Sequence, residues 1–372
     1  MQFSKVIGQN SVKQLLLEMV SNKRMPHAQL LLGPEGCGKL ALAIAFAQYV
    51  LCENKEEADS CGLCKACNKV EKLIHPDLHF SYPTVGTNVI STHLLESWRE
   101  AILENPYLNV NQWLQHIGAE NKQGNINKEE CVSIIKKLSL KIFEGSHKVL
   151  ILWLPEFLGK EGNRLLKMIE EPPENTLFIL VAENQEKILN TILSRCQIIK
   201  VNRLSDQVIV KELEERESMP LEELQSIAHM ANGNFNGALK LKEQKDNDNA
   251  NLFLDWLRKC YRGNGVELVN WVEKFASIGR ENQKHFLRYA LHFLREYLAL
   301  KMLNDQKVRL QSAELQSAKK LMNVIEFEQV QQIAKLFDDC SYYIERNANP
   351  KVLFLDASIQ INKILKTKTV SY

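Results

Sequence analysis

The stretch Gly33-Pro34-Glu35-Gly36-Cys37-Gly38-Lys39-Leu40 decides the fold class of this chain. It matches the phosphate-binding loop pattern G-x-x-x-x-G-K-[ST] at every position except the last. In that pattern, backbone N–H groups converge on phosphate oxygens, the lysine reaches the terminal phosphates, and a hydroxyl binds Mg²⁺. Leu40 has no oxygen, so the loop lacks its metal ligand. The candidate nucleotide-binding residues are Gly33, Gly36, Gly38 and Lys39.

The segments on either side of this loop have the composition that a phosphate-binding loop requires. Residues Ala28 to Leu32 form a short apolar run, which predicts a buried strand. Residues Lys39 to Leu51 are rich in Ala, Leu, Ile and Phe, which predicts a packed helix. A strand, a glycine turn and a helix in this order support a P-loop over a chance glycine-rich turn.

Length and composition limit the possible classes of protein. A chain of 372 residues is long enough for two or three domains. A formal net charge of +2 gives no overall basic field of the kind that marks a free-standing nucleic-acid binder. The N-terminus MQFSKVIGQN has no signal-peptide pattern, and no apolar run reaches the length of a membrane span. We therefore expect a cytoplasmic protein without a membrane partner, whose nine cysteines stay reduced.

Four of the nine cysteines are close together in the sequence. Cys61, Cys64 and Cys67 lie in a tight turn that contains Gly62, and Cys52 lies at the end of the preceding predicted helix. Four thiolates suit a structural Zn²⁺ ion, which leaves no open coordination position for catalysis. The same set also suits an iron–sulfur cluster, and we regard that as the second interpretation. Zn²⁺ is thus the expected cofactor, with Cys52, Cys61, Cys64 and Cys67 as its ligands.

The continuous apolar run from Val149 to Leu154 predicts a central strand of a parallel sheet that is covered on both faces. In a nucleotide hydrolase such a strand ends in Asp-Glu, where the Asp helps to hold Mg²⁺ and the Glu activates water. This strand instead ends in Trp153-Leu154-Pro155. Glu156 is the nearest acid, but it is displaced by two residues and follows a proline.

The remaining pattern predicts the domain organisation. The sequence predicts two further strands, at Leu177–Val181 and Gln197–Val201. They alternate with helices predicted at Gly162–Glu171 and from about Lys187. This alternation indicates a parallel α/β sheet. Strand signals end near Asp206, and amphipathic helices follow to the C-terminus. We predict an α/β P-loop domain over residues 1–203, a small helical lid domain over residues 204–244, and an all-α domain over residues 245–372. The first domain includes the cysteine module (52–67) and a polar, Asn-rich helical insertion over about 84–125; the polar run 245–249 is the predicted linker.

The motifs together resemble one family, the AAA+ clamp-loader subunits of bacterial DNA polymerase III. Those that carry the resemblance are, in chain order, the P-loop, the four cysteines, His75-Pro76-Asp77, the run from Asn163 to Glu174 with its Glu-Glu-Pro-Pro-Glu end, Ser194-Arg195-Cys196, and Asn347-x-Asn349-Pro350. They span nearly the whole chain apart from the 84–125 insertion. The resemblance implies that the α/β domain is an AAA+ domain and that the C-terminal domain is an oligomerisation collar.

The resemblance also implies partners and one catalytic residue. Members of the family form a hetero-pentameric ring that opens a sliding clamp and places it on primed DNA, within the DNA polymerase III holoenzyme. Their ATP sites lie between neighbouring subunits, and one subunit supplies an arginine to the site of the next. Arg195 matches that arginine finger. Its planar, permanent charge suits the neutralisation of charge on a transferred phosphoryl group.

Four positions depart from the pattern of an ATP-hydrolysing relative. Leu40 replaces the hydroxyl, Trp153 and Leu154 replace the acids, and Asn236 stands in place of a second sensing arginine. Phosphoryl transfer depends on charge and positioning, so we predict that the chain does not hydrolyse ATP in its own site. Whether the loop binds nucleotide stays open: Lys39 and the backbone would hold ATP or ADP weakly without metal, and Glu35 adds unfavourable charge.

Two other hypotheses belong to different functional classes. The first is an autonomous P-loop ATPase of a related replication or repair complex, which would use an unconventional residue such as Glu156. The second is a zinc-containing DNA-binding module in which Lys65, Lys69 and Lys72 contact phosphates. Turnover by the isolated chain would favour the first, and salt-sensitive binding of DNA by the monomer would favour the second.

Overall fold

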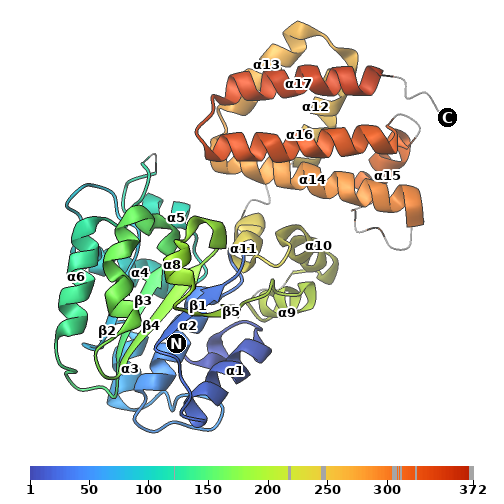
Figure 1. The fold of residues 1–372 in the computed structure, drawn as a ribbon. Coiled ribbons are helices and arrows are strands. Elements are labelled where there is room, and N and C mark those ends of the chain that lie inside the picture. The colour runs from blue at the N-terminus through green and yellow to red at the C-terminus, as the bar shows by residue number, and fades with distance from the viewer. Residues whose placement is uncertain are drawn as a thin grey trace. The chain divides into compact units, whose positions relative to one another are not determined.

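The computed structural model describes residues 1–120, 122–216, 219–243, 249–303, 308, 310, 312–322 and 325–367. The chain divides into two compact units, Met1–Leu241 and Lys242–Tyr372. The first unit holds the only sheet found among the described residues, and the second consists of helices (Figure 1). The predicted boundary between residues 244 and 245 lies outside the described residues, and the three-domain division stays a prediction.

The first unit is built on a five-stranded sheet in the order β2-β3-β4-β1-β5. The strands are β1 (Ala28–Leu32), β2 (Leu78–Ser81), β3 (Lys148–Trp153), β4 (Thr176–Ala182) and β5 (Gln197–Lys200). Every pairing is parallel, and β1 lies between β4 and β5 with Leu30 opposite Leu180 and Ile198. Parallel neighbours require crossover connections, and helices supply most of them.

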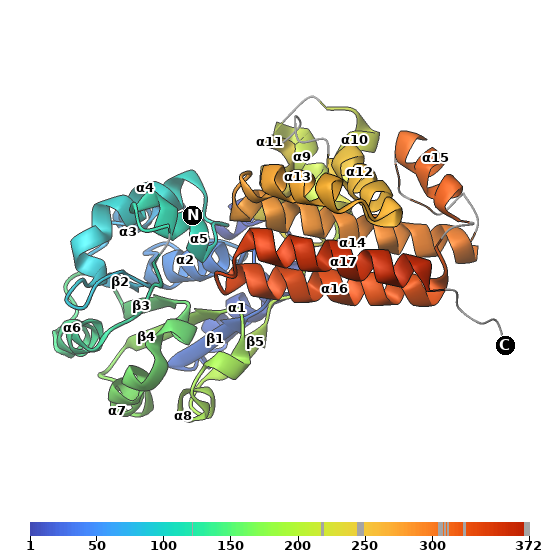
Figure 2. The ribbon, with the colours of Figure 1, turned by 90° about the horizontal axis from the view of Figure 1, so that it is seen from above.

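Helices cover both faces of this sheet. Along β3, Val149, Ile151 and Trp153 point into one hydrophobic core, whereas Leu150 and Leu152 point into another. This alternation follows from the two-residue period of a strand and explains why every residue of β3 and β4 is buried. Figure 2 shows the sheet between the layer of α2 to α5 and the layer of α6, α7 and α8.

The helices of the first unit differ greatly in burial. All thirteen residues of α2 are buried, which accounts for its apolar composition on every side. The helices of this unit that precede β5 are α1 (Asn10–Ser21), α2 (Lys39–Leu51), α3 (Lys65–Glu71), α4 (Leu95–Glu104), α5 (Val110–His116), α6 (Lys128–Ser139), α7 (Leu166–Glu170) and α8 (Asn190–Leu193), with short 3₁₀ helices at Phe3–Lys5, Ser91–Leu94, Pro155–Leu165 and Gln185–Lys187. The helices α9 (Asp206–Arg216), α10 (Leu221–Ala231) and α11 (Phe235–Glu243) follow β5.

An aromatic cluster joins the 84–125 segment to the sheet. Trp98 of α4 stacks on Tyr82 with ring centroids 4.0 Å apart, and it contacts the rings of Trp113 and Trp153 at 5.2 Å each. Trp98 and Trp113 are completely buried. Large buried rings dominate core energetics, so the predicted insertion is a part of the core of this unit.

The described residues of the second unit form six helices that pack around their own core. They are α12 (Asn249–Arg262), α13 (Gly265–Ala276), α14 (Arg280–Leu303), α15 (Ser312–Leu321), α16 (Phe327–Glu345) and α17 (Pro350–Lys366). Trp256 lies at the centre, where its ring contacts Trp271, Phe286 and Phe337, and its indole N–H donates to Ser358 Oγ at 2.9 Å. α17 begins at Pro350, and Asn349 caps it through the N–H of Lys351, as expected for an Asn-Pro start.

The structure confirms the predicted fold class, a parallel α/β P-loop domain followed by helices. It differs at two predicted helices. The Gly162–Glu171 segment begins as a 3₁₀ helix at Pro155, and only Leu166–Glu170 is α-helical; the helix expected from Lys187 is reduced to Asn190–Leu193. Residues 245–248 of the predicted linker lie outside the described residues. Among the described residues, no helix combines the length and apolarity needed to span a bilayer.

Candidate functional site

The P-loop joins β1 to α2 and has the backbone geometry that its glycines allow. Gly36 and Gly38 have φ angles of +68° and +93°, a region that L side chains seldom adopt. A Cβ atom on Gly33 would lie 2.1 Å from the carbonyl oxygen of Val201, so only glycine fits there. The sequence prediction of a glycine-dependent turn between a strand and a helix is therefore confirmed.

The side chain of Lys39 is engaged by its own surroundings. It is 5% exposed, and its Nζ donates to the Pro34 carbonyl oxygen at 2.5 Å. The same Nζ lies 3.9 Å from Glu183 Oε1 and 3.9 Å from Cys37 Sγ. The lysine of the P-loop motif thus contacts its own loop and lies close to the Glu183 carboxyl.

Glu183 is a residue of this site that the sequence did not reveal. It follows directly after β4, the strand that pairs with β1, and so comes to lie beside the P-loop. Burial raises the pKa of the Glu183 carboxyl to about 7, while the charge of Lys39 opposes this shift. An acidic residue immediately after a fully buried strand next to β1 was the available signal.

The 84–125 segment and the start of α11 pack against the P-loop. Glu35 Oε1 accepts hydrogen bonds from Asn109 Nδ2 and Asn234 Nδ2, each at 3.1 Å. The backbone N–H of Phe235 donates to the carbonyl oxygen of Gly36 at 3.0 Å, and the ring of Tyr107 lies against Gly38. These contacts hold the loop with protein groups from two segments that are distant in the sequence.

The four positions that depart from a hydrolysing site are all buried. Leu40 and Leu154 are 4% and 3% exposed, and Trp153 belongs to the aromatic cluster around Trp98. Asn236 is 1% exposed: its side chain accepts from Asn105 Nδ2 at 2.9 Å and donates to Gln112 Oε1 at 2.6 Å. A charged residue at Trp153 or Leu154 would be placed in an apolar interior at a large desolvation cost.

Glu156 has a structural role. One of its carboxylate oxygens accepts from the backbone N–H groups of Glu183 at 2.5 Å and Asn184 at 2.8 Å. It thus joins the segment after β3 to the segment after β4. These two main-chain hydrogen bonds fix Glu156 as a link between the two segments.

Arg195 lies on the surface between α8 and β5. Its Nε donates to Glu170 Oε2 at 3.1 Å and its Nη1 donates to the Thr191 carbonyl oxygen at 2.9 Å. Its side chain is 31% exposed and that of Glu170 is 57% exposed. An exposed ion pair of this kind contributes at most about 1 kcal/mol, so the guanidinium can exchange its carboxylate for another anion at small cost.

The four cysteines of the predicted metal site come together. Their Sγ atoms all lie within 4.8 Å of one another. The Sγ of Cys61 is 3.6 Å from that of Cys52 and 3.9 Å from that of Cys67, and a tetrahedron of Zn–S bonds of about 2.3 Å has edges of about 3.8 Å. The donor set therefore fits a tetrahedral metal ion.

Backbone N–H groups point at these sulfur atoms. The N–H groups of Cys61, Cys64 and Cys67 donate to the Sγ of Cys52, Cys61 and Cys64 at 3.3–3.4 Å. N–H groups of Leu63 and Cys64 lower the pKa of Cys61 to about 7, whereas burial raises the pKa of Cys52. Such donors stabilise thiolates, the form that binds metal.

The family model described as "DNA polymerase III, delta subunit" matches residues 8–205, more than half of the chain. The chain belongs to this family. The match covers the P-loop, the cysteine cluster and Arg195, and it ends at the start of the helical segment that begins with α9.

Curated DNA polymerase III subunits are similar to more than half of the chain. DNA polymerase III subunit tau of Bacillus subtilis is 29% identical over 249 residues, which cover 65% of this chain and 37% of that protein. Subunit gamma of Buchnera aphidicola is 28% identical over 251 residues, with 66% and 59% covered. Subunit delta' of Bacillus subtilis is 26% identical over 213 residues, with 57% and 53% covered. The chain thus spans between 37% and 59% of the length of these relatives and is a member of the DNA polymerase III clamp-loader subunit family.

Proposed function

We propose that this chain is the delta-prime subunit of a DNA polymerase III clamp loader, a subunit that does not hydrolyse ATP in its own site. In a ring of five subunits it would help to place a sliding clamp on primed DNA. One observation carries the proposal: the positions of metal ligand, acids and sensing arginine are occupied by Leu40, Trp153, Leu154 and Asn236, all of them buried in protein contacts. The tau and gamma relatives are 29% and 28% identical and the delta' relative 26%, so this observation, not the similarity, favours delta-prime.

The same proposal gives Arg195 a role in the ATP site of a neighbouring subunit. The guanidinium is partly exposed, and its only ionic partner among the described residues is the exposed Glu170. A phosphate offers two oxygens to a planar guanidinium and forms a stronger charge-assisted pair than this carboxylate does. Removal of an arginine finger typically costs 10³-fold or more in the rate of the affected site.

We assign a structural Zn²⁺ ion to Cys52, Cys61, Cys64 and Cys67. The sulfur spacing, the N–H donors and the four-thiol set support this assignment. The ion would fix the turn between α2 and α3, and with four thiolate ligands it would leave no position for substrate. Nucleotide in the chain's own P-loop would be bound weakly and without Mg²⁺, since Leu40 offers no hydroxyl and the Glu183 carboxyl lies 3.9 Å from Lys39 Nζ.

The test is ATP hydrolysis by the complex reconstituted with the tau and delta subunits of the same cell, the clamp and primed DNA. Arg195→Ala should lower the DNA-stimulated rate of the complex at least severalfold. Arg164→Ala is the matched control, because Arg164 is also a surface arginine in a single ion pair, with Glu161 at 2.6 Å. We expect this control to retain the rate within about twofold.

Two results would count against the proposal. If a complex with Arg195→Ala assembles normally and hydrolyses ATP at an undiminished rate, Arg195 is not an arginine finger. Turnover by the isolated chain that is lost in Lys39→Ala would instead indicate an autonomous ATPase. Assembly is checked separately by gel filtration, so a failure to assemble is distinguishable from a loss of catalysis.

A further inference from the structure

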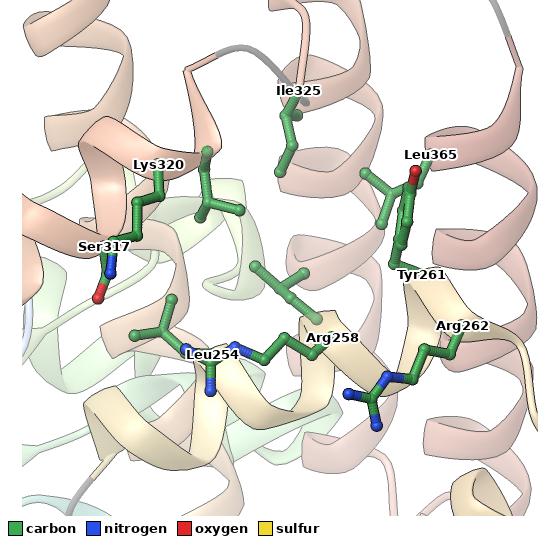
Figure 3. A pocket seen from close by; sticks show the side chains of 10 residues that line it. Leu254, Arg258, Tyr261, Arg262, Ser317, Lys320, Ile325 and Leu365 are labelled. Carbon is green, nitrogen blue, oxygen red and sulfur yellow. The ribbon is translucent and has the colours of Figure 1, made fainter.

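The helical unit contains a pocket that is separate from the P-loop, Arg195 and the cysteine cluster. It has a volume of about 320 Å³ and is lined by residues of α12, α15 and α17 together with Ile325 (Figure 3). Leu254, Leu257, Arg258 and Tyr261 are all among its lining residues. Their spacing of three, four and seven residues places them on one face of α12, so the pocket is a feature of helix packing.

The inner part of the pocket is aliphatic. Leu254, Leu257 and Leu365 are 7%, 3% and 8% exposed, and each contributes to the lining. Ile325, which is 3% exposed, closes the pocket from another segment (Figure 3). A floor of this kind binds an apolar side chain and offers nothing to a phosphate.

The charged residues of the pocket are all basic. Arg258, Arg262 and Lys320 line it, and none of the ten lining residues is acidic. Among the described residues, no ion pair involves Arg258 or Lys320, and Arg262 has only a distant one, 3.9 Å from Glu267. Unpaired cations beside an aliphatic floor attract a ligand that combines carboxylates with an apolar group.

The size of the pocket narrows the choice of occupant. A volume of about 320 Å³ lies at the small end of ligand pockets, with room for one or two large side chains. The basic residues come from two different helices, α12 and α15, and the side chains of Arg258 and Lys320 both reach toward the Leu254 end of the pocket (Figure 3). This arrangement suits a chain that inserts one apolar side chain into the pocket and presents neighbouring acidic residues to Arg258 and Lys320.

We propose that this pocket is a docking site for an acidic peptide segment of a partner protein. One aromatic or long aliphatic side chain of that segment enters the floor formed by Leu254, Leu257 and Leu365. Its carboxylates contact Arg258 and Lys320. The proposal does not depend on the fate of ATP in this subunit, since every residue of the pocket lies in the unit Lys242–Tyr372.

The experiment uses the full chain and a short fluorescein-labelled peptide of aspartate and glutamate residues with one central phenylalanine. Fluorescence anisotropy should give saturable binding that weakens as salt is raised, because exposed charges are screened. Arg258→Glu combined with Lys320→Glu should weaken binding about tenfold or more. Lys274→Glu, a reversal at an exposed lysine of the same unit outside the lining, should change it by less than about twofold.

Changes in the probe test the apolar floor without altering the protein. A peptide with serine in place of the phenylalanine should bind about tenfold more weakly. Equal binding of the serine peptide, or of the Arg258→Glu/Lys320→Glu variant, would overturn the proposal. So would tight binding of dodecanoate or oligothymidylate that displaces the peptide, because the pocket would then serve a small amphiphile or nucleic acid.

Discussion

The P-loop and the cysteine cluster lie at opposite ends of the same helix, α2, and differ in which parts of a binding site they contain. The P-loop at its N-terminus has the backbone of a phosphate site, yet Lys39 and Glu35 are bonded to protein groups and Leu40 is buried. The cysteine cluster at its C-terminus, Cys52 with Cys61, Cys64 and Cys67, brings four sulfur atoms together with N–H donors aimed at them. The P-loop thus has the backbone conformation of its motif, whereas the cysteine cluster also has the side chains that bind an ion.

The difference teaches that the shape of a loop and its chemistry are separable. The glycines of the P-loop are required by close packing against Val201, Asn234 and Tyr107, whether or not a nucleotide binds. The cysteines have no such packing reason to lie together, since four unliganded thiols in contact gain little and are open to oxidation. Substitutions in the two loops should therefore have different consequences.

The largest effect is expected in the cysteine cluster. Cys67→Ser removes one of four ligands, so the chain should lose its bound metal, and its thermal midpoint should fall by about 5–10 °C. Metal content by mass spectrometry and a thermal melt measure both quantities. Cys196→Ser, at a half-buried cysteine outside the cluster, should leave the metal in place. If the Cys67→Ser variant bound as much zinc as the parent chain, the assigned ligand set would be wrong.

A smaller effect is expected when the P-loop hydroxyl is restored. Leu40→Thr places a hydroxyl in a position that is 4% exposed and removes packed methyl groups, so it should destabilise the chain by about 1–3 kcal/mol. ATP turnover should stay at background, because Trp153, Leu154 and Asn236 remain. Leu140→Thr, at a leucine that is 62% exposed, is the control for the substitution itself. Measurable Mg²⁺-dependent hydrolysis by Leu40→Thr would show that the hydroxyl was the only group that the site lacked for hydrolysis.

The carboxyl of Glu183 should make stability depend on pH. Its pKa is raised to about 7, so ionisation in the folded state is unfavourable and stability is lost as pH rises from about 4.5 through 7. Glu183→Gln should therefore stabilise the chain at pH 8 by about 1–2 kcal/mol, with little effect at pH 4.5. Urea unfolding at the two pH values measures this difference. The exposed Glu186→Gln should show no such pH dependence, and a Glu183→Gln effect that is equal at both values would contradict a raised pKa.

The smallest effect is expected from the P-loop lysine. Lys39→Met should weaken ATP binding by about threefold or less, because the site lacks the Mg²⁺-binding hydroxyl and the Glu183 carboxyl lies 3.9 Å from Nζ, so Lys39 contributes little affinity. Calorimetric titration with and without Mg²⁺ measures the affinity. Tight, Mg²⁺-dependent binding in the parent chain that disappears in Lys39→Met would mean that nucleotide displaces these internal partners.

Sequence was sufficient where structure is local. The strand Ala28–Leu32 and the helix Lys39–Leu51 have the predicted bounds, and the predicted strand Val149–Leu154 is shifted by one residue. Apolar runs of this kind belong in a sheet covered on both faces wherever they occur. The cysteine cluster was predictable for a similar reason, since three of its members are separated by only two residues each.

Sequence was insufficient where distant segments meet. Tyr107 and Asn109 lie about seventy residues after the P-loop, and their polar, Asn-rich surroundings resemble a surface insertion. Their place beside the loop depends on Trp98 and Trp113 entering the core, which the local pattern does not reveal. The aromatic residues in that otherwise polar segment were the available signal, because rings of this size are seldom left exposed.

The main-chain hydrogen bond from Phe235 N–H to the Gly36 carbonyl oxygen has a consequence for motion. It fastens the first turn of α11 to the loop after β1, and the Asn234 side chain reinforces it by bonding Glu35. The segment α9 to α11 cannot swing away from the sheet unless these bonds break together. Amide hydrogen exchange at Phe235 should then be as slow as exchange in β1 itself, because both require the same cooperative opening.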